Sequence, residues 1–141
     1  MKKIILPLFL SCLILSAGQD SMARTAARMS NTILDAEIVS ILPAKDSFVV
    51  VSTRSLRSSK YGQMIRMTAA SAISYQMMKS PKTKITSIGF CDQEMAKEKK
   101  ALRLVLSPSF KDAYKKLRAG TISIDAFLAI MESNTSEIFV K

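Results

Sequence analysis

The chain has 141 residues and a formal charge of +10, and it contains neither histidine nor tryptophan. Apolar residues make up 48% of it and charged residues 23%, which suffices for the core of one folded domain. The missing histidine excludes Ser-His and Cys-His nucleophile pairs, histidine acid–base catalysis and metal sites that require an imidazole ligand.

Residues 1–23 have the three parts of a secretory signal peptide. Two lysines precede an uncharged apolar run of 14 residues at 4–17, and small and polar residues follow it. The run is shorter than the roughly 20 residues that a transmembrane helix needs. We expect cleavage after Ala23, because Ser21 and Ala23 place small side chains three and one residues before the break. Cleavage after Gly18 and an uncleaved N-terminal anchor are the alternatives.

The signal peptide predicts export from a bacterial cell, to the periplasm or to the medium. After it, the pattern of the chain predicts a flexible lead-in or short helix at 24–35 and a single α+β domain over 36–141. Residues 36–42 and 47–53 are rich in β-branched residues, which favours strands. The four-residue link between them suits a hairpin turn, so we expect an antiparallel pair.

A helical period follows the hairpin. Ser58 or Ser59 is placed to cap a helix that runs to about residue 78, and Pro81 lies just beyond its end. Residues 84–90 return to the composition of a strand. The predicted order is therefore β-β-α-β, a small sheet with a helix on one face.

The last part of the chain predicts a C-terminal helical hairpin. Residues 109–119 and 124–132 have helical apolar stripes, and the glycine and serine between them suit the end of one helix and the start of the next. We expect residues 138–140 either to form a last short strand or to hold the C-terminal tail against the domain. Residues 92–106 fit either a helix or, over 101–106, a strand, and the helix is the preferred interpretation.

The positive charge gathers in the middle of the chain. Residues 47–91, which we call the basic segment, carry seven basic residues and no Asp or Glu. The seven are Arg54, Arg57, Lys60, Arg66, Lys79, Lys82 and Lys84. One sign of charge over this length produces an appreciable field if the side chains share a face.

The basic segment predicts contact with an acidic protein or an anionic component of the cell envelope, and peripheral contact with a membrane is compatible with it. Its aromatic residues are sparse and do not alternate with the basic ones, which argues against nucleic acid. The alternative is that these charges only keep a small exported protein soluble. The seven basic residues are the candidate partner-binding site.

Cys91 is the one cysteine that follows the predicted cleavage site. It is interpreted as a buried structural thiol, as half of an intermolecular disulfide, or as a nucleophile, and the neighbouring Asp92 and the missing histidine base weaken the last interpretation. The sequence contains no Ser-x-x-Lys pair, metal-ligand pattern or phosphate-binding glycine loop. We therefore predict a protein that is not an enzyme and has no cofactor.

Four methionines, Met64, Met67, Met77 and Met78, lie on the predicted central helix. Methionine adapts to irregular cores and to promiscuous binding surfaces. Core packing is preferred here over a copper site, because the four residues are not spaced to meet at one ion.

These patterns together predict an exported binding or accessory protein. Its basic segment would contact an acidic envelope component or an envelope-spanning assembly such as a secretion or conjugation machine. The alternative function is that of a secreted effector or inhibitor that acts on a host or competitor protein.

Overall fold

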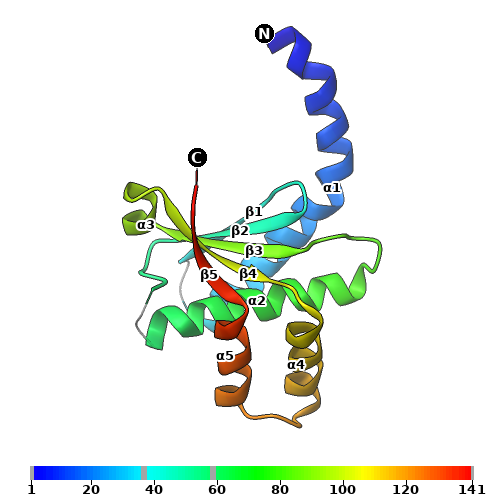
Figure 1. Cartoon of the computed structure of the whole chain (residues 1–141). Helices are drawn as coiled ribbons and strands as arrows, with labels where there is room; N and C mark the ends of the chain where they lie inside the picture. The colour runs from blue at the N-terminus through cyan, green and yellow to red at the C-terminus, as the bar shows by residue number, and fades with distance from the viewer. Residues whose placement is uncertain (1, 36–37, 58–59, 141) are drawn as a thin grey trace.

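The computed structural model describes residues 2–35, 38–57 and 60–140, and it describes side chains from residue 18 onward. Within these residues the chain has an α+β fold with one five-stranded mixed sheet, as predicted (Figure 1). The elements in chain order are α1 (Lys2–Ile33), β1 (Val39–Pro43), β2 (Ser47–Ser52), α2 (Lys60–Lys79), β3 (Ser87–Asp92), α3 (Gln93–Lys97), β4 (Lys100–Val105), α4 (Pro108–Ala119), α5 (Ile124–Ser133) and β5 (Thr135–Phe139).

The strands lie in the sheet in the same order as in the chain, β1-β2-β3-β4-β5. Strands β2 and β3 are parallel and are joined by the crossover helix α2, whereas the other three pairs are antiparallel. The predicted hairpin of β1 and β2 is confirmed, with Leu42 opposite Val49. Its turn is closed by the N–H of Ala44, which donates to the carbonyl of Ser47 at 2.8 Å.

Helices cover only one face of the sheet. Strand residues that alternate along the chain point to this face and are buried, among them Phe48, Val50, Ile88, Phe90 and Leu104. The residues between them along each strand point to the other face, on which no long helix packs within the described part of the chain. In Figure 1 the sheet crosses the middle of the molecule, with α4 and α5 extending from one side as a hairpin.

Helices α1 and α2 pack against each other over the covered face. Small residues on both helices are buried, including Ala23 and Ala26 on α1 and Ala69 on α2, so the two backbones approach closely. The first half of α1 extends away from the domain (Figure 1). Within the described residues, no helix is at once long enough and apolar enough to cross a membrane.

Gly62, in the first turn of α2, allows the preceding loop to lie against the helix. A Cβ atom at this position would lie 2.7 Å from the carbonyl oxygens of Ser55 and Arg57 and 2.9 Å from the carbonyl carbon of Leu56. Only glycine tolerates such contacts without a backbone shift. This loop places Arg57 beside the end of the sheet.

The predicted helical hairpin is present as α4 and α5. Ser107 caps α4, Ser123 caps α5, and Gly120 ends α4 in the left-handed conformation with φ 73°. The rings of Phe110 and Phe127 pack with centroids 5.5 Å apart and hold the two helices together.

The preferred interpretation of residues 92–106 as one helix was wrong. Helix α3 occupies only Gln93–Lys97, and Lys99 ends it with a left-handed φ of 56°. The chain then forms β4, a strand that pairs with β3 on one side and β5 on the other. Pairing on both sides outweighs helix propensity, because it satisfies both edges of the strand backbone.

Other element boundaries differ by a few residues from the prediction. Strand β3 begins at Ser87 rather than Lys84, and β5 begins at Thr135. Residues 24–33 continue α1, so the expected lead-in is helical as far as Ile33. The predicted helix caps Ser58 and Ser59, and the predicted start of the first strand at residues 36–37, lie outside the described residues.

Candidate functional site

Arg57 is not available to a partner as a free charge. Its Nη1 lies 2.6 Å from Oε2 of Glu98, and its Nη2 lies 3.2 Å from Oε1 of Glu137. Lys100 joins the same cluster at 3.2 Å from Glu137. The hydrogen bond with Glu98 raises the pKa of Arg57 above its ordinary value, because it stabilises the charged guanidinium.

Arg66 is buried, with 4% of its surface exposed. Its Nε donates to the carbonyl of Leu56 at 2.9 Å, and its Nη1 pairs with the carboxylate of Glu132 on α5. Asp92 also binds this loop, because its Oδ2 accepts a hydrogen bond from the N–H of Leu56 at 2.8 Å. Its Oδ1 accepts from the N–H of Met95 and so caps α3. The role of Arg66 is therefore internal.

The remaining five members of the basic segment, Arg54, Lys60, Lys79, Lys82 and Lys84, have exposed side chains. None of them forms an ion pair within the described residues. They do not gather at one place, because Lys60 and Lys79 are the first and last residues of α2 and lie about 28 Å apart along its axis.

Helix α4 adds three further cations beside the C-terminal end of α2. Lys111, Lys115 and Arg118 are spaced by four and three residues, which places them on one face of the helix. Lys116 lies on another face and pairs with Asp112 at 3.0 Å. These cations lie outside the basic segment, although their shared helix face follows from their spacing in the sequence.

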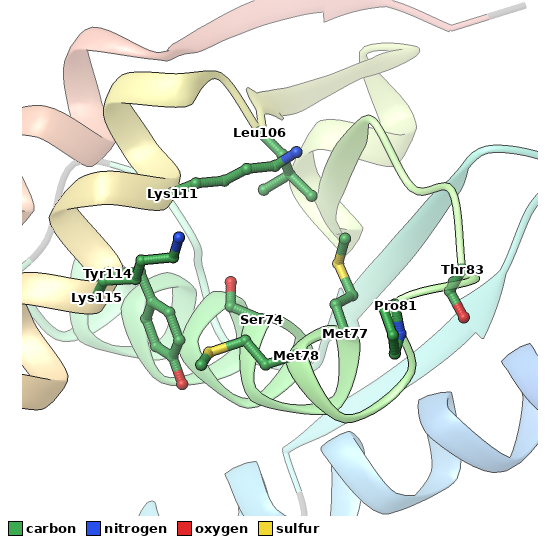
Figure 2. Close-up of a pocket in the computed structure, with 9 residues that line it drawn as sticks. All are labelled: Ser74, Met77, Met78, Pro81, Thr83, Leu106, Lys111, Tyr114 and Lys115. Carbon is green, nitrogen blue, oxygen red and sulfur yellow. The ribbon is translucent and has the colours of Figure 1, made fainter.

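Two of these cations, Lys111 and Lys115, line a pocket of about 240 Å³ between α2 and α4, which we call the α2–α4 pocket. Figure 2 shows the residues that line it: Ser74, Met77, Met78, Pro81, Thr83, Leu106, Lys111, Tyr114 and Lys115. Thioether, ring and aliphatic groups form most of its walls. The ammonium end of Lys111 reaches across from α4 toward Leu106 (Figure 2).

Lys79 and Arg118 extend this positive region past the pocket. Lys79 Nζ lies 4.6 Å, and the guanidinium carbon of Arg118 4.8 Å, from the centroid of the Tyr75 ring. Nη1 of Arg118 also contacts the sulfur of Met78 at 3.6 Å. We call the four residues Lys79, Lys111, Lys115 and Arg118 the cationic rim, and none of them reaches a carboxylate within the described part of the chain.

Tyr114 lies at the wall of the pocket and is 6% exposed. Burial raises the pKa of its phenol above the ordinary value, because the phenolate would lose its hydration. The positive charge of Arg118 opposes this shift. The phenol of Tyr114 is therefore neutral at neutral pH.

Cys91 lies on β3, on the face of the sheet that helices leave uncovered, opposite Val51 of β2. It is half-buried in a shallow hollow of about 820 Å³ over this face. Burial and the charge of Asp92 raise the pKa of its thiol, so the thiolate that a nucleophile needs is disfavoured. Whether Cys91 forms an intermolecular disulfide stays a prediction.

Among the described residues, no group of three or more acidic or cysteine side chains is placed to hold a metal ion. Comparisons of the chain with protein-family models, with curated protein sequences and with solved structures give no match. The structure separates Arg57 and Arg66 from the other basic residues and joins Lys79 to the cations of α4.

Proposed function

We propose that the protein is an exported, non-enzymatic binding or accessory protein that contacts an acidic protein of the cell envelope or of an envelope-spanning assembly. The observation that carries the proposal is the cationic rim around an apolar pocket. Four positive charges without a carboxylate among the described residues attract an anionic surface, and the pocket offers a place for an apolar anchor.

The size of the pocket supports a protein partner. A volume of about 240 Å³ is below the roughly 300 Å³ at which pockets for drug-sized ligands begin. One large apolar side chain is of the right size, whereas a lipid acyl chain is too long to be enclosed. We infer an acidic protein segment that inserts one leucine- or phenylalanine-sized side chain between carboxylates that meet the rim.

The test is affinity capture from the cell envelope with crosslinking, using three matched forms of the protein. Lys111→Ala with Lys115→Ala removes half of the rim and should lower recovery of the partner about tenfold, or about 1.4 kcal/mol. Arg54→Ala with Lys60→Ala removes two equally exposed charges of the basic segment at the other end of α2 and should leave recovery unchanged.

A third variant separates the pocket from the charges. Ser74 lines the pocket, and Ser74→Leu places a branched side chain in it without changing the rim. Recovery should fall although the charge is the same. If Ser74→Leu recovers as much partner as the unchanged protein, while salt and removal of the rim charges lower recovery, no apolar side chain of the partner enters the pocket.

Three further outcomes would overturn the proposal. Equal loss of capture from both charge-removal pairs would mean that overall charge, rather than the rim, attracts the partner. Tight binding to vesicles that contain anionic lipid, with no protein recovered, would make the partner a membrane. Accumulation in the culture medium would favour the secreted effector instead.

A further inference from the structure

Helix α1 joins the hydrophobic core from Met22 onward. Met22 is 8% exposed, and Ala23 and Ala26 are each 1% exposed. The sulfur of Met22 accepts a hydrogen bond from Oγ1 of Thr83 at 3.5 Å, which ties α1 to the loop before β3. Two of these core residues precede the cleavage position that the sequence favours.

Cleavage after Ala23 would remove Met22 and Ala23 before the domain folds. The space that they fill beside Thr83 would be left empty, and the folded chain would lose the contacts of a buried side chain. The part of α1 that remains would be 24–33, which is short for a helix. Its first turn would carry the new α-amine and Arg24, two positive charges at the positive end of the helix dipole.

Cleavage after Gly18 keeps Met22 and Ala23 and a longer α1, and it leaves Asp20 to offset the charge of the new α-amine. Ser16 and Gly18 also place small residues three and one before the break, so the pattern that signal peptidase reads is satisfied at both positions. Asp20 would then lie in the first turn of α1, where a negative charge is favourable. Its carboxylate already pairs with Arg24 at 2.7 Å.

We propose that signal peptidase hydrolyses the Gly18–Gln19 bond, so that the mature protein begins at Gln19 and keeps Met22 and Ala23 in its core. Water adds across this peptide bond, the released signal peptide ends in the carboxylate of Gly18, and the mature chain begins with the amine of Gln19. The proposal rests on the export that the proposed function includes, but not on the partner.

The experiment uses a matched pair of full-length variants expressed in a bacterium that exports the chain. Gly18→Leu places a large side chain directly before the proposed break, and Ser21→Leu places one three residues before the alternative break. Both positions are exposed, and a Cβ at Gly18 meets no atom within 4 Å. Neither change therefore disturbs the core.

Intact mass and N-terminal sequencing of the exported protein give the result. We expect the unchanged chain and Ser21→Leu to begin at Gln19, and Gly18→Leu to accumulate at least tenfold more uncleaved precursor. A start at Arg24, normal processing of Gly18→Leu, or a start at any residue other than Gln19 would overturn the proposal. A full-length chain that stays in the cytoplasm would overturn it together with the exported function, whereas loss of partner capture alone would leave it standing.

Discussion

The two ends of α2 carry similar positive side chains in opposite surroundings. At the N-terminal end, Arg57 and Arg66 are held by carboxylates of the last third of the chain. At the C-terminal end, the cationic rim has no such partner among the described residues. The helix dipole explains part of the difference, because its N-terminal end is itself positive and its C-terminal end favours cations.

The two ends show that the net charge of a sequence segment does not give the charge of the surface that it forms after folding. The basic segment has no acidic residue, yet its partners come from 41, 66 and 80 residues further along the chain. Folding pairs Arg57 and Arg66 with carboxylates and brings the cations of α4 beside Lys79. If Arg57 and Arg66 are structural and the cationic rim is free, substitutions at the two ends of α2 should differ in effect.

The largest effect is expected from Arg66→Met. The change leaves the carbonyl of Leu56 and the carboxylate of Glu132 without their buried partner. Loss of one member of a buried pair costs roughly 3–5 kcal/mol, and because Glu132 is 42% exposed we expect about 3 kcal/mol. Urea unfolding followed by circular dichroism measures the change.

Lys79→Met is the matched control at the other end of α2. Lys79 is exposed and has no ion pair in the described structure, so its removal should change the free energy of unfolding by less than about 0.5 kcal/mol. Equal effects of the two substitutions would break the distinction between the two ends.

The next largest loss of stability is expected from the loop that positions Arg57. Gly62→Ala places a methyl group 2.7 Å from two backbone oxygens, and we expect about 2 kcal/mol of destabilisation because the loop has to move. Gly89→Ala is the control, since its nearest neighbour atom is Val49 Cγ2 at 3.8 Å, an ordinary contact. Similar losses for the two variants in urea unfolding would show that the loop does not press on the helix.

A smaller effect belongs to the pocket and depends on pH. The pKa of Tyr114 is raised above 10.0 in the folded state, so the neutral phenol stabilises the fold below that pH. This contribution is lost as the pH rises through the folded pKa. Tyr114→Phe should therefore show a shallower loss of stability than the unchanged protein between pH 9 and pH 11 in urea titrations. Parallel curves would mean that the phenol is hydrated.

The smallest effects come from neighbouring residues on α4. Lys115→Glu introduces the first carboxylate into the rim and should stabilise the fold by about 0.5 kcal/mol at low salt. Lys116→Glu removes the pair with Asp112 and should destabilise it by about the same amount. The two shifts should shrink together in 0.5 M salt, and shifts of the same sign would contradict a rim of unpaired cations.

Local patterns predicted much of the fold. The β-branched composition of 47–53, the period of α2 and the glycine and serine that bound α4 and α5 are properties of neighbouring residues. Strand β4 was only the alternative to a helix in the sequence, because its stability comes from partners on both sides, which no local pattern contains. The ion pairs of Arg57 were invisible for the same reason.

The sequence alone predicts only part of the candidate site. Lys111, Lys115 and Arg118 share a helix face by their spacing alone, and Lys79 ends the neighbouring helix. Which face of α4 meets α2 depends on the packing of Phe110 and its helix against the core. The pocket therefore required the tertiary structure.

The order of strands in the sheet has a consequence for how the domain assembles. Each strand pairs with the strand that precedes it in the chain, so no later segment has to be inserted between two earlier ones. A chain leaves a ribosome or a translocation channel with its N-terminus first. The sheet of this protein can be extended in that same direction, one strand at a time, and only the β2–β3 pair has to wait for a helix to be completed.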